Sequence, residues 1–242
     1  MNRSSRRVQL TPGFLLHQRP FRDTSLILEV FTREHGRLTV FARGARGPRP
    51  RFHGLRPFQA LLLSYSGRGE APQLTAAEPD GIAPPLPGDC LLGAFYLNEL
   101  LIRLTERHDP HPELFDAYGA TLAALRAGAP LEPALRRFEK QLLDLTGFGL
   151  DFAVDVDGRA VEPHAYYHFQ PGRGLLPAAD DAAGSCPGRV LLALAAEAPL
   201  LQTEELKAAR ALLRAALDHC LEGRELSTRA VARSVAKLER TL

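Results

Sequence analysis

The hydrophobic pattern of this chain changes its period once, at the proline-rich segment 83–87 (APPLP). Before this segment, apolar residues form short runs separated by turn residues, which is typical of strands. After it, apolar residues recur three and four positions apart, which is typical of amphipathic helices. Proline fixes φ and has no backbone N–H, so the segment interrupts both kinds of structure. The sequence therefore predicts an α+β protein with a β domain over residues 1–82 and a helical domain over residues 83–242.

Five short strands are predicted in the β domain, with no helical period between them. They cover residues 13–17, 25–32, 37–42, 60–66 and 73–77. Glu34, His35 and Gly36 form a tight hairpin turn, in which Gly36 can take a positive φ. Five strands in so short a segment favour a small, closed or nearly closed barrel. An OB-fold is preferred because of the basic loops, although an SH3-like barrel or a small sandwich fits the strand pattern almost as well.

Helices are predicted over residues 90–108, 111–128, 132–146, 189–196, 203–222 and 227–242. Gly128 ends the second of them and Gly147 follows the third, since glycine commonly ends a helix. Residues 148–187 are rich in Gly, Pro and Asp and are predicted to form an irregular insert.

Positive charge is concentrated in the first third of the chain, although the formal net charge is only +2. Residues 1–85 contain 13 basic residues, all arginine, and six acidic residues, which gives +7. Residues 86–242 contain 17 basic and 22 acidic residues, which gives −5. This asymmetry indicates a nucleic-acid-binding module joined to another domain. An arginine-rich proteome would explain the preference for Arg over Lys but not the asymmetry.

The densest basic segment is residues 43–56 (RGARGPRPRFHGLR), called the basic loop below. Its glycines and prolines disfavour a helix, and it has no acidic residue. Arginine keeps its charge and offers planar pairs of donors to phosphate, so the loop suits a nucleic-acid backbone. A solvated loop without a ligand is the alternative. The predicted DNA-contacting residues are Arg19, Arg22, Arg37, Arg43, Arg46, Arg49, Arg51, Arg56 and Phe52.

Aromatic side chains in the β domain are candidates for stacking on bases. Phe31 and Phe58 lie in apolar surroundings and are predicted to be core residues. Phe41 is out of phase with the apolar residues of its strand and Phe52 lies in the basic loop, so these two are the candidates for exposure.

No catalytic constellation, cofactor site or metal site is indicated. His164 and His168 are four residues apart, but they have no nearby third ligand, so no metal is predicted. Asp155 and Asp157 beside Gly158 predict a hairpin turn. We therefore expect a protein that is not an enzyme and binds no cofactor.

The cysteines and apolar segments indicate a cytoplasmic location. Cys90, Cys186 and Cys220 are far apart and match neither a disulfide framework nor zinc-ligand spacing, which fits a reducing compartment. The N-terminal residues MNRSSRRVQL lack the apolar run of a signal peptide, and the longest apolar segment, 190–196, is too short to span a bilayer. We expect no membrane partner.

Four segments carry a family resemblance through their order and spacing. They are residues 13–49 (GFLLHQRPFRDTSLILEVFTREHGRLTVFARGARGPR), 55–70 (LRPFQALLLSYSGRGE), 95–104 (FYLNELLIRL) and 132–152 (EPALRRFEKQLLDLTGFGLDF). Together they resemble the bacterial recombination mediator RecO family over roughly residues 8–225. The resemblance implies an OB-fold followed by a helical domain, binding to single- and double-stranded DNA, annealing of complementary strands and association with the nucleoid. It also implies that the partner RecR joins in loading recombinase onto DNA coated by single-strand-binding protein.

One departure from the family concerns zinc. Many members carry four zinc-binding cysteines after the GFG-like motif, whereas residues 148–187 contain only Cys186. The chain is therefore similar to a zinc-less branch. Tyr166, Tyr167 and Phe169 are expected to form a small substitute core.

The resemblance further implies that the helical domain receives the C-terminal tail of single-strand-binding protein. That acidic tail ends in an apolar residue and a free carboxylate, so its site needs an apolar slot and a cation. The alternative is that the apolar sides of the helices are plain core and their charges are solvated. The predicted tail-binding residues are Leu135, Arg136, Leu142, Leu206, Lys207 and Arg210.

Two other functions remain open. One is an RNA-binding or translation-associated OB-fold module with the helices as a docking platform. The other is a hydrolase that uses carboxylates of the helical domain. Strand annealing would distinguish the first from a recombination mediator, and turnover would reveal the second.

Overall fold

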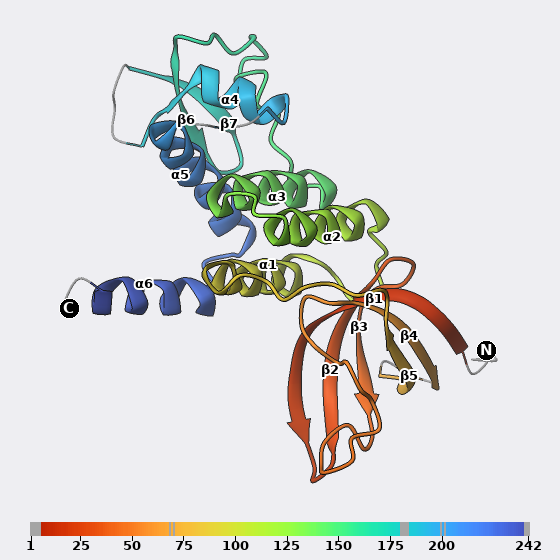
Figure 1. Cartoon of the computed structure of the whole chain (residues 1–242). Coiled ribbons are helices and arrows are strands. Elements are labelled where there is room, and N and C mark those ends of the chain that lie inside the picture. Colours follow the sequence, from red (N-terminus) through yellow and green to blue (C-terminus); the bar gives the residue numbers. More distant parts are fainter. Residues whose placement is uncertain are drawn as a thin grey trace. The chain divides into compact units, whose positions relative to one another are not determined.

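The computed structural model describes residues 6–67, 69, 71–179, 184–198, 200 and 202–239 (Figure 1). The chain divides into two compact units, Met1–Arg126 and Ala127–Leu242. The first unit holds the predicted β domain and also two helices that the sequence assigned to the helical domain. The compact units meet after Arg126, whereas the sequence predicts a change from strands to helices after residue 82. A division into compact units does not test that change, so the boundary at residue 82 stays a prediction.

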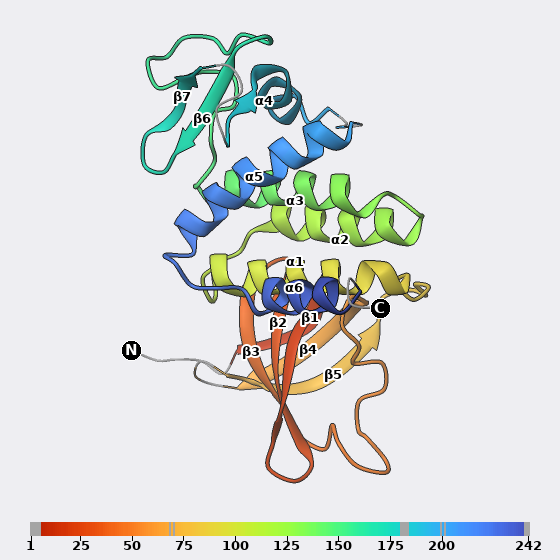
Figure 2. The same ribbon diagram turned by 90° about the vertical axis from the view of Figure 1, so that its left-hand side faces the viewer.

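The five predicted strands form a closed barrel (Figure 2). The strands are β1 (Arg6–Phe21), β2 (Ser25–Thr32), β3 (Gly36–Ala42), β4 (Ala60–Gly67) and β5 (Gln73–Pro79). Their order around the barrel is β1-β2-β3-β5-β4, and β1 pairs with β4 to close it. β3 and β5 are parallel, whereas the other neighbours are antiparallel. This five-stranded arrangement agrees with the preferred OB-fold.

Side chains alternate between the two faces of each strand, and this alternation explains which residues form the core of the barrel. Leu28 and Val30 of β2 lie directly opposite Val40 and Leu38 of β3, and all four side chains are buried. Such apolar cross-strand pairs stabilise a sheet and fix its register, because a slip by one residue would turn each side chain to the opposite face. The predicted bounds of β2 are confirmed, and those of β3 are correct to within one residue.

β1 is far longer than the strand predicted over residues 13–17, so that prediction was too short. Its pairing register shifts between Val8 and Thr11 and again between Leu15 and His17. These irregularities break the alternation on which a prediction depends. They also bend the strand, which allows it to pair with β2 at one end and with β4 at the other.

The β2–β3 hairpin requires glycine for two reasons. Gly36 has a φ of +65°, which confirms the predicted positive φ. In addition, a Cβ atom at Gly36 would lie 2.0 Å from the backbone oxygen of Asp109. The His108 N–H donates to the Arg37 carbonyl oxygen at 2.8 Å, so the segment after the first helix lies directly against the hairpin.

Two helices follow the barrel in the first unit. After the short 3-10 helix η1 (Gly88–Cys90) come α1 (Leu91–Leu104) and α2 (Pro112–Arg126). The predicted helix over residues 90–108 was too long, because Thr105 is already extended. The predicted helix over residues 111–128 agrees with α2 to within two residues.

Buried polar and aromatic contacts join these helices to β1. The Asn98 side chain donates to the Leu16 carbonyl oxygen at 2.8 Å and accepts from the Tyr118 hydroxyl at 2.5 Å. The Phe14 ring contacts the rings of Phe115 and Tyr118, with centroids 5.0 and 4.9 Å apart. The Asn98 side chain therefore supports a buried contact between α1, α2 and β1.

The second unit contains four helices and a small sheet among its described residues. The helices are α3 (Leu131–Leu145), α4 (Gly188–Ala195), α5 (Thr203–Cys220) and α6 (Ser227–Glu239). The sheet has the order β7-β6-β8 and consists of β6 (Tyr166–Gln170), β7 (Gly174–Ala178) and β8 (Cys186–Pro187). Residues 240–242 of the predicted last helix lie outside the described residues.

The sheet corrects the prediction that residues 148–187 are irregular. Its strands have only two to five residues, which is too short for a clear hydrophobic period. Of the three aromatic residues expected to form a small core, Tyr167 is buried, whereas Tyr166 and Phe169 are half-buried. The Tyr167 hydroxyl accepts a hydrogen bond from the Glu162 N–H at 2.9 Å.

The predicted turn at Asp155 is confirmed. One oxygen of its carboxylate accepts hydrogen bonds from the N–H groups of Asp157 and Arg159, each at 2.9 Å, and Gly158 has a φ of +74°.

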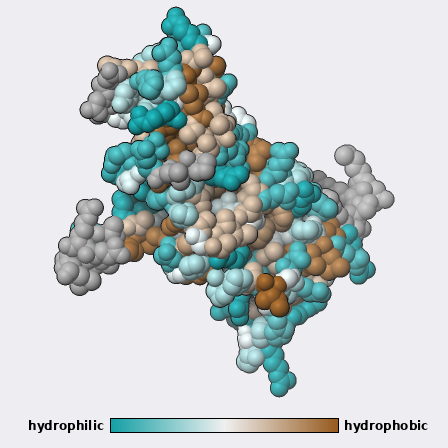
Figure 3. Space-filling view, turned by 45° about the horizontal axis from the view of Figure 1, so that its top comes forward, coloured by the Kyte–Doolittle hydropathy of each residue, from teal (hydrophilic) through white to brown (hydrophobic). Residues whose placement is uncertain are grey.

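Hydrophilic residues cover much of the face seen in Figure 3, with apolar residues among them. The large apolar side chains that the described residues expose are Leu10, Ile82, Leu91, Phe95, Phe148, Val231 and Val235. No described helix has the length and apolar character that crossing a membrane requires.

Candidate nucleic-acid interface

The basic loop leaves the end of β3 and lies against the turn between β1 and β2, at the lower end of the barrel in Figures 1 and 2. The Arg46 N–H donates to the Thr24 carbonyl oxygen at 2.9 Å, and the Arg51 N–H donates to that of Gly44 at 2.7 Å. Gly44 and Gly47 have positive φ, so glycine permits this path. The loop contains no helix or strand, as predicted.

The basic loop exposes five arginine side chains. None of them forms an ion pair or a side-chain hydrogen bond with another described residue, so no carboxylate in that part of the chain neutralises them. The Arg51 guanidinium lies over the Phe52 ring, 5.3 Å from its centroid. These residues are Arg43, Arg46, Arg49, Arg51 and Arg56.

The β1–β2 hairpin adds two exposed arginines beside the loop. Arg19 is near the end of β1, and Arg22 lies in the turn with its guanidinium 5.2 Å from the centroid of the Phe21 ring. Seven of the predicted DNA-contacting arginines therefore lie exposed on the hairpin and the adjoining loop. Their contact with DNA stays a prediction.

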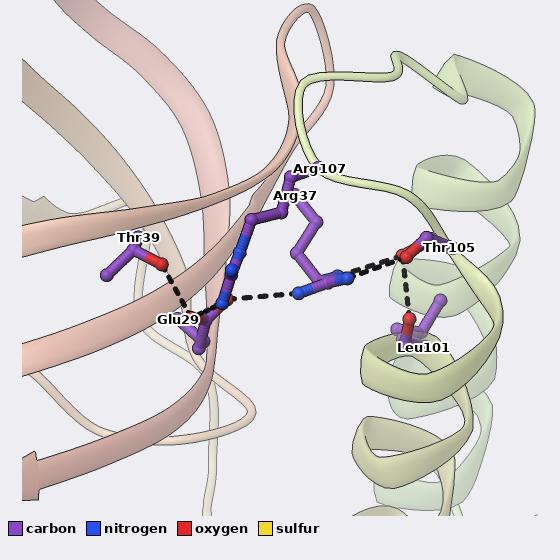
Figure 4. A network of polar contacts seen from close by, with 6 residues as sticks. All are labelled: Glu29, Arg37, Thr39, Leu101, Thr105 and Arg107. Carbon is purple, nitrogen blue, oxygen red and sulfur yellow. Dashed lines mark hydrogen bonds and ion pairs between the residues drawn. The ribbon is translucent and has the colours of Figure 1, made fainter. Parts of the chain in front are cut away.

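Arg37 differs from these seven because its guanidinium is buried and used within the protein (Figure 4). It donates to the Thr105 hydroxyl at 3.2 Å, to the Thr105 carbonyl oxygen at 2.7 Å and to the Glu29 carboxylate at 3.2 Å. Burial lowers its pKa in spite of the nearby Glu29. A guanidinium held in this way is not available to a phosphate, so Arg37 does not belong with the exposed set.

Glu29 is the centre of this polar network (Figure 4). Its carboxylate accepts from the Thr39 hydroxyl and from the Arg107 guanidinium, each at 2.6 Å, as well as from Arg37. Burial by itself would raise the pKa of this carboxyl group. The hydrogen bonds from Thr39 and Arg107 and the two positive charges outweigh burial, and the pKa is lowered. The network therefore ties β2 and β3 to the segment that follows α1.

The exposure of the aromatic side chains in the β domain differs in part from the prediction. Phe52 is 7% exposed and belongs to the core cluster of the barrel, so the expectation that it is exposed is wrong, whereas its contact with DNA stays a prediction. Phe31 and Phe58 are buried, as predicted. Phe41 is half-buried and packs on the Phe21 ring, with centroids 5.4 Å apart.

A cavity of about 450 Å³ lies between the basic loop and the β1–β2 hairpin. Gln18, Pro20 and Leu26 line it from the hairpin, and Arg46 and Arg56 are among the loop residues that line it. The sequence did not reveal the hairpin residues of this cavity, because none of them carries a charge.

The predicted tail-binding residues come from two helices, α3 and α5, that pack against each other. Leu135, Arg136 and Leu142 of α3 are buried, and the Arg136 guanidinium pairs with the Glu139 carboxylate at 2.8 Å. Arg136 is therefore an interior residue and not a surface cation.

The α5 residues of this set are more accessible. Leu206 is half-buried, and Lys207 and Arg210 are exposed. Lys207 pairs with Glu204 at 2.8 Å and Arg210 pairs with Glu132 at 3.4 Å, both in largely exposed positions. Such exposed pairs exchange readily with water and ligands.

The described residues contain no cluster of three or more His, Cys, Asp or Glu side chains that could hold a metal ion. His164 is exposed in a turn and His168 is half-buried in β6, so they do not share a helix face. The absence of metal, cofactor and catalysis stays a prediction.

The fold and this surface define a class, namely OB-fold proteins with an arginine-rich loop beside the β1–β2 hairpin. Two family models match the chain: "Recombination protein O N terminal" over residues 7–81 and "Recombination protein O C terminal" over residues 88–230. The chain belongs to the recombination protein O family of DNA repair proteins, as the sequence resemblance indicated.

Curated relatives carry the name DNA repair protein RecO. The protein of Alkalilimnicola ehrlichii is 46% identical over 98% of this chain and 96% of its own length. That of Thiobacillus denitrificans is 43% identical over 97% of this chain and 95% of its own length. That of Methylococcus capsulatus is 45% identical over 94% of each chain.

Proposed function

We propose that this protein is a non-enzymatic recombination mediator that binds single- and double-stranded DNA through the basic loop and the β1–β2 hairpin. The observation that carries the proposal is the group of five exposed arginines on the basic loop, none of which is neutralised by a described carboxylate. Family membership supports a role in DNA repair. The proposed contacts are Arg19, Arg22, Arg43, Arg46, Arg49, Arg51 and Arg56.

The proposed interaction is with phosphates and not with sequence. Arginines spread along a glycine- and proline-rich loop can neutralise phosphates of two strands, and the released counterions favour binding. Lower repulsion between strands would promote annealing of complementary sequences. We infer that this activity acts on DNA coated by single-strand-binding protein and, together with RecR, helps to load recombinase. The site of action is then the cytoplasm, at the nucleoid.

The test compares DNA binding by the wild type and by a variant with four loop arginines changed to alanine. The positions are Arg43, Arg46, Arg49 and Arg51. Affinity should fall about equally for all sequences, and the slope of log affinity against log salt should flatten by up to about 3.6 for a duplex, since each of the four lost phosphate contacts removes about 0.9. The matched control changes four exposed arginines elsewhere, Arg103, Arg159, Arg173 and Arg224, and should keep the wild-type slope. Unchanged binding by the loop variant would refute the interface.

Annealing requires its own assay. Complementary oligonucleotides precoated with single-strand-binding protein should anneal faster with the wild type than with the loop variant. An equal or greater effect on coated RNA would instead favour the RNA-binding alternative.

We further propose that the tail of single-strand-binding protein binds on the surface of α5. Lys207 and Arg210 would attract its carboxylates and Leu206 would contact its apolar tip, whereas Arg136, Leu135 and Leu142 support α3 from inside. Charge reversal at Lys207 or Arg210 should weaken tail-peptide binding about tenfold, because a charge-assisted hydrogen bond contributes roughly 1.5–3 kcal/mol. Binding to naked DNA should not change. If both variants bind the peptide with wild-type affinity, the tail-binding site does not lie on α5.

A further inference from the structure

The cavity beside the basic loop is lined by both apolar and cationic side chains, and more of its surface is polar than apolar. Leu26, Leu55 and Phe52 supply apolar surface, whereas Arg46 and Arg56 contribute exposed guanidinium groups. None of the residues that line the cavity is acidic. A ligand that joins an anionic group to a flat part with polar edges therefore matches the cavity.

The walls of the cavity are held in place by the barrel. Phe52 is packed into the barrel core, and Leu26 and Leu55 pack against the same core cluster. The hydrogen bond from the Arg46 N–H to Thr24 fixes the loop against the hairpin turn. Gly54 has a φ of +93° and approaches Pro79 so closely that a Cβ would lie 3.1 Å from its ring, so this part of the loop is also constrained.

The size of the cavity fits one nucleotide unit. Its volume of about 450 Å³ lies in the usual range for small-ligand sites, roughly 300–1,000 Å³. A base has two apolar faces and a polar edge, and its phosphate would lie near the exposed guanidinium groups. Gln18 offers both a donor and an acceptor at the wall, so it can meet the edge of any base.

We propose that this cavity binds one unstacked base of single-stranded DNA, with the neighbouring phosphates on Arg46 and Arg56. The proposal rests on the DNA-binding function proposed above and adds a preference for strands that present free bases. In a duplex each base is paired and stacked, so its faces are not available to the cavity. The arginines outside the cavity bind either form of DNA through phosphates alone.

The test uses a variant that fills the cavity without changing charge. Ala45 lines the cavity and is half-buried, so Ala45→Phe places a ring in the space proposed for the base. The probes are an oligothymidylate, an oligonucleotide of the same length with abasic sites in place of its bases, and a duplex. The wild type should bind the oligothymidylate at least about fivefold more tightly than the abasic strand, as expected from the energy of stacking a single base.

In the Ala45→Phe variant this preference should disappear, because affinity for the oligothymidylate falls to that for the abasic strand. The size control is Ala123→Phe, which enlarges an exposed position on α2 and should keep the preference. Gln18→Ala provides a second test that does not crowd the core, because Gln18 is exposed. It should reduce the preference at least about twofold through the loss of one hydrogen bond.

The outcomes separate this inference from the proposed function. If the wild type binds the abasic strand and the oligothymidylate equally, or if both cavity variants keep the preference, the cavity does not bind a base. The function proposed above would then still hold. If the wild type binds none of the three probes, the DNA-binding function itself fails.

Discussion

Replacement of Arg37 by methionine tests whether this arginine belongs to the fold or to the DNA interface. Its side chain and that of Glu29 are 11% and 15% exposed, and it donates three hydrogen bonds, two of them to Thr105. Breaking a buried ion pair costs about 3–5 kcal/mol. Glu29 keeps its contacts with Arg107 and Thr39, so we expect the lower end of that range.

A loss of about 3 kcal/mol should lower the melting temperature by roughly 6–12 °C for a chain of this size. The assay is thermal unfolding followed by circular dichroism, together with DNA binding measured well below the transition. DNA affinity and its salt dependence should equal those of the wild type, because the guanidinium is not exposed.

The matched control is Arg33→Met on the same hairpin. Arg33 makes two hydrogen bonds to the Asp116 carboxylate, at 3.0 and 2.8 Å, but both side chains are largely exposed. Water replaces these contacts readily, so this variant should melt close to the wild type. If Arg37→Met melts like the wild type but loses DNA affinity, Arg37 contacts DNA and the reasoning from burial is refuted.

Three further outcomes are expected. Because the pKa of Glu29 is lowered in the folded state, its ionised form stabilises the fold above the ordinary Glu pKa of 4.5, and this contribution is lost as the pH falls through the lowered value. Glu29→Gln should therefore flatten the loss of stability in acid, and an unchanged acid unfolding curve would contradict the assignment. Gly36→Ala should destabilise the protein by at least about 2 kcal/mol in denaturant unfolding, through the positive φ and the contact with Asp109. Gly88→Ala, with open space around it, should be nearly neutral, and equal effects of the two changes would contradict this explanation. Metal analysis of chelator-washed protein should find far less than one zinc per chain, whereas stoichiometric zinc would mean that residues 148–187 were misinterpreted.

The sequence alone determined the features that depend on local pattern. The period switch at residues 83–87 separated the strands of the barrel from the first helices, and alternation located β2 and β3 to within one residue. The hairpin pattern predicted the positive φ of Gly36, because turn geometry is decided within a few residues. The density of arginine identified the basic loop, because charge is readable without any tertiary contact.

Tertiary structure decided which side chains are accessible. Arg37 and Arg43 look alike in sequence, but Arg37 meets Thr105, 68 positions along the chain, and becomes an interior residue. Phe52 lies among exposed arginines and yet packs into the barrel core. The cavity exists only because the β1–β2 hairpin and the basic loop come together. Such pairings join residues distant in sequence, and a local pattern carries no information about the partner that a side chain meets when the barrel closes.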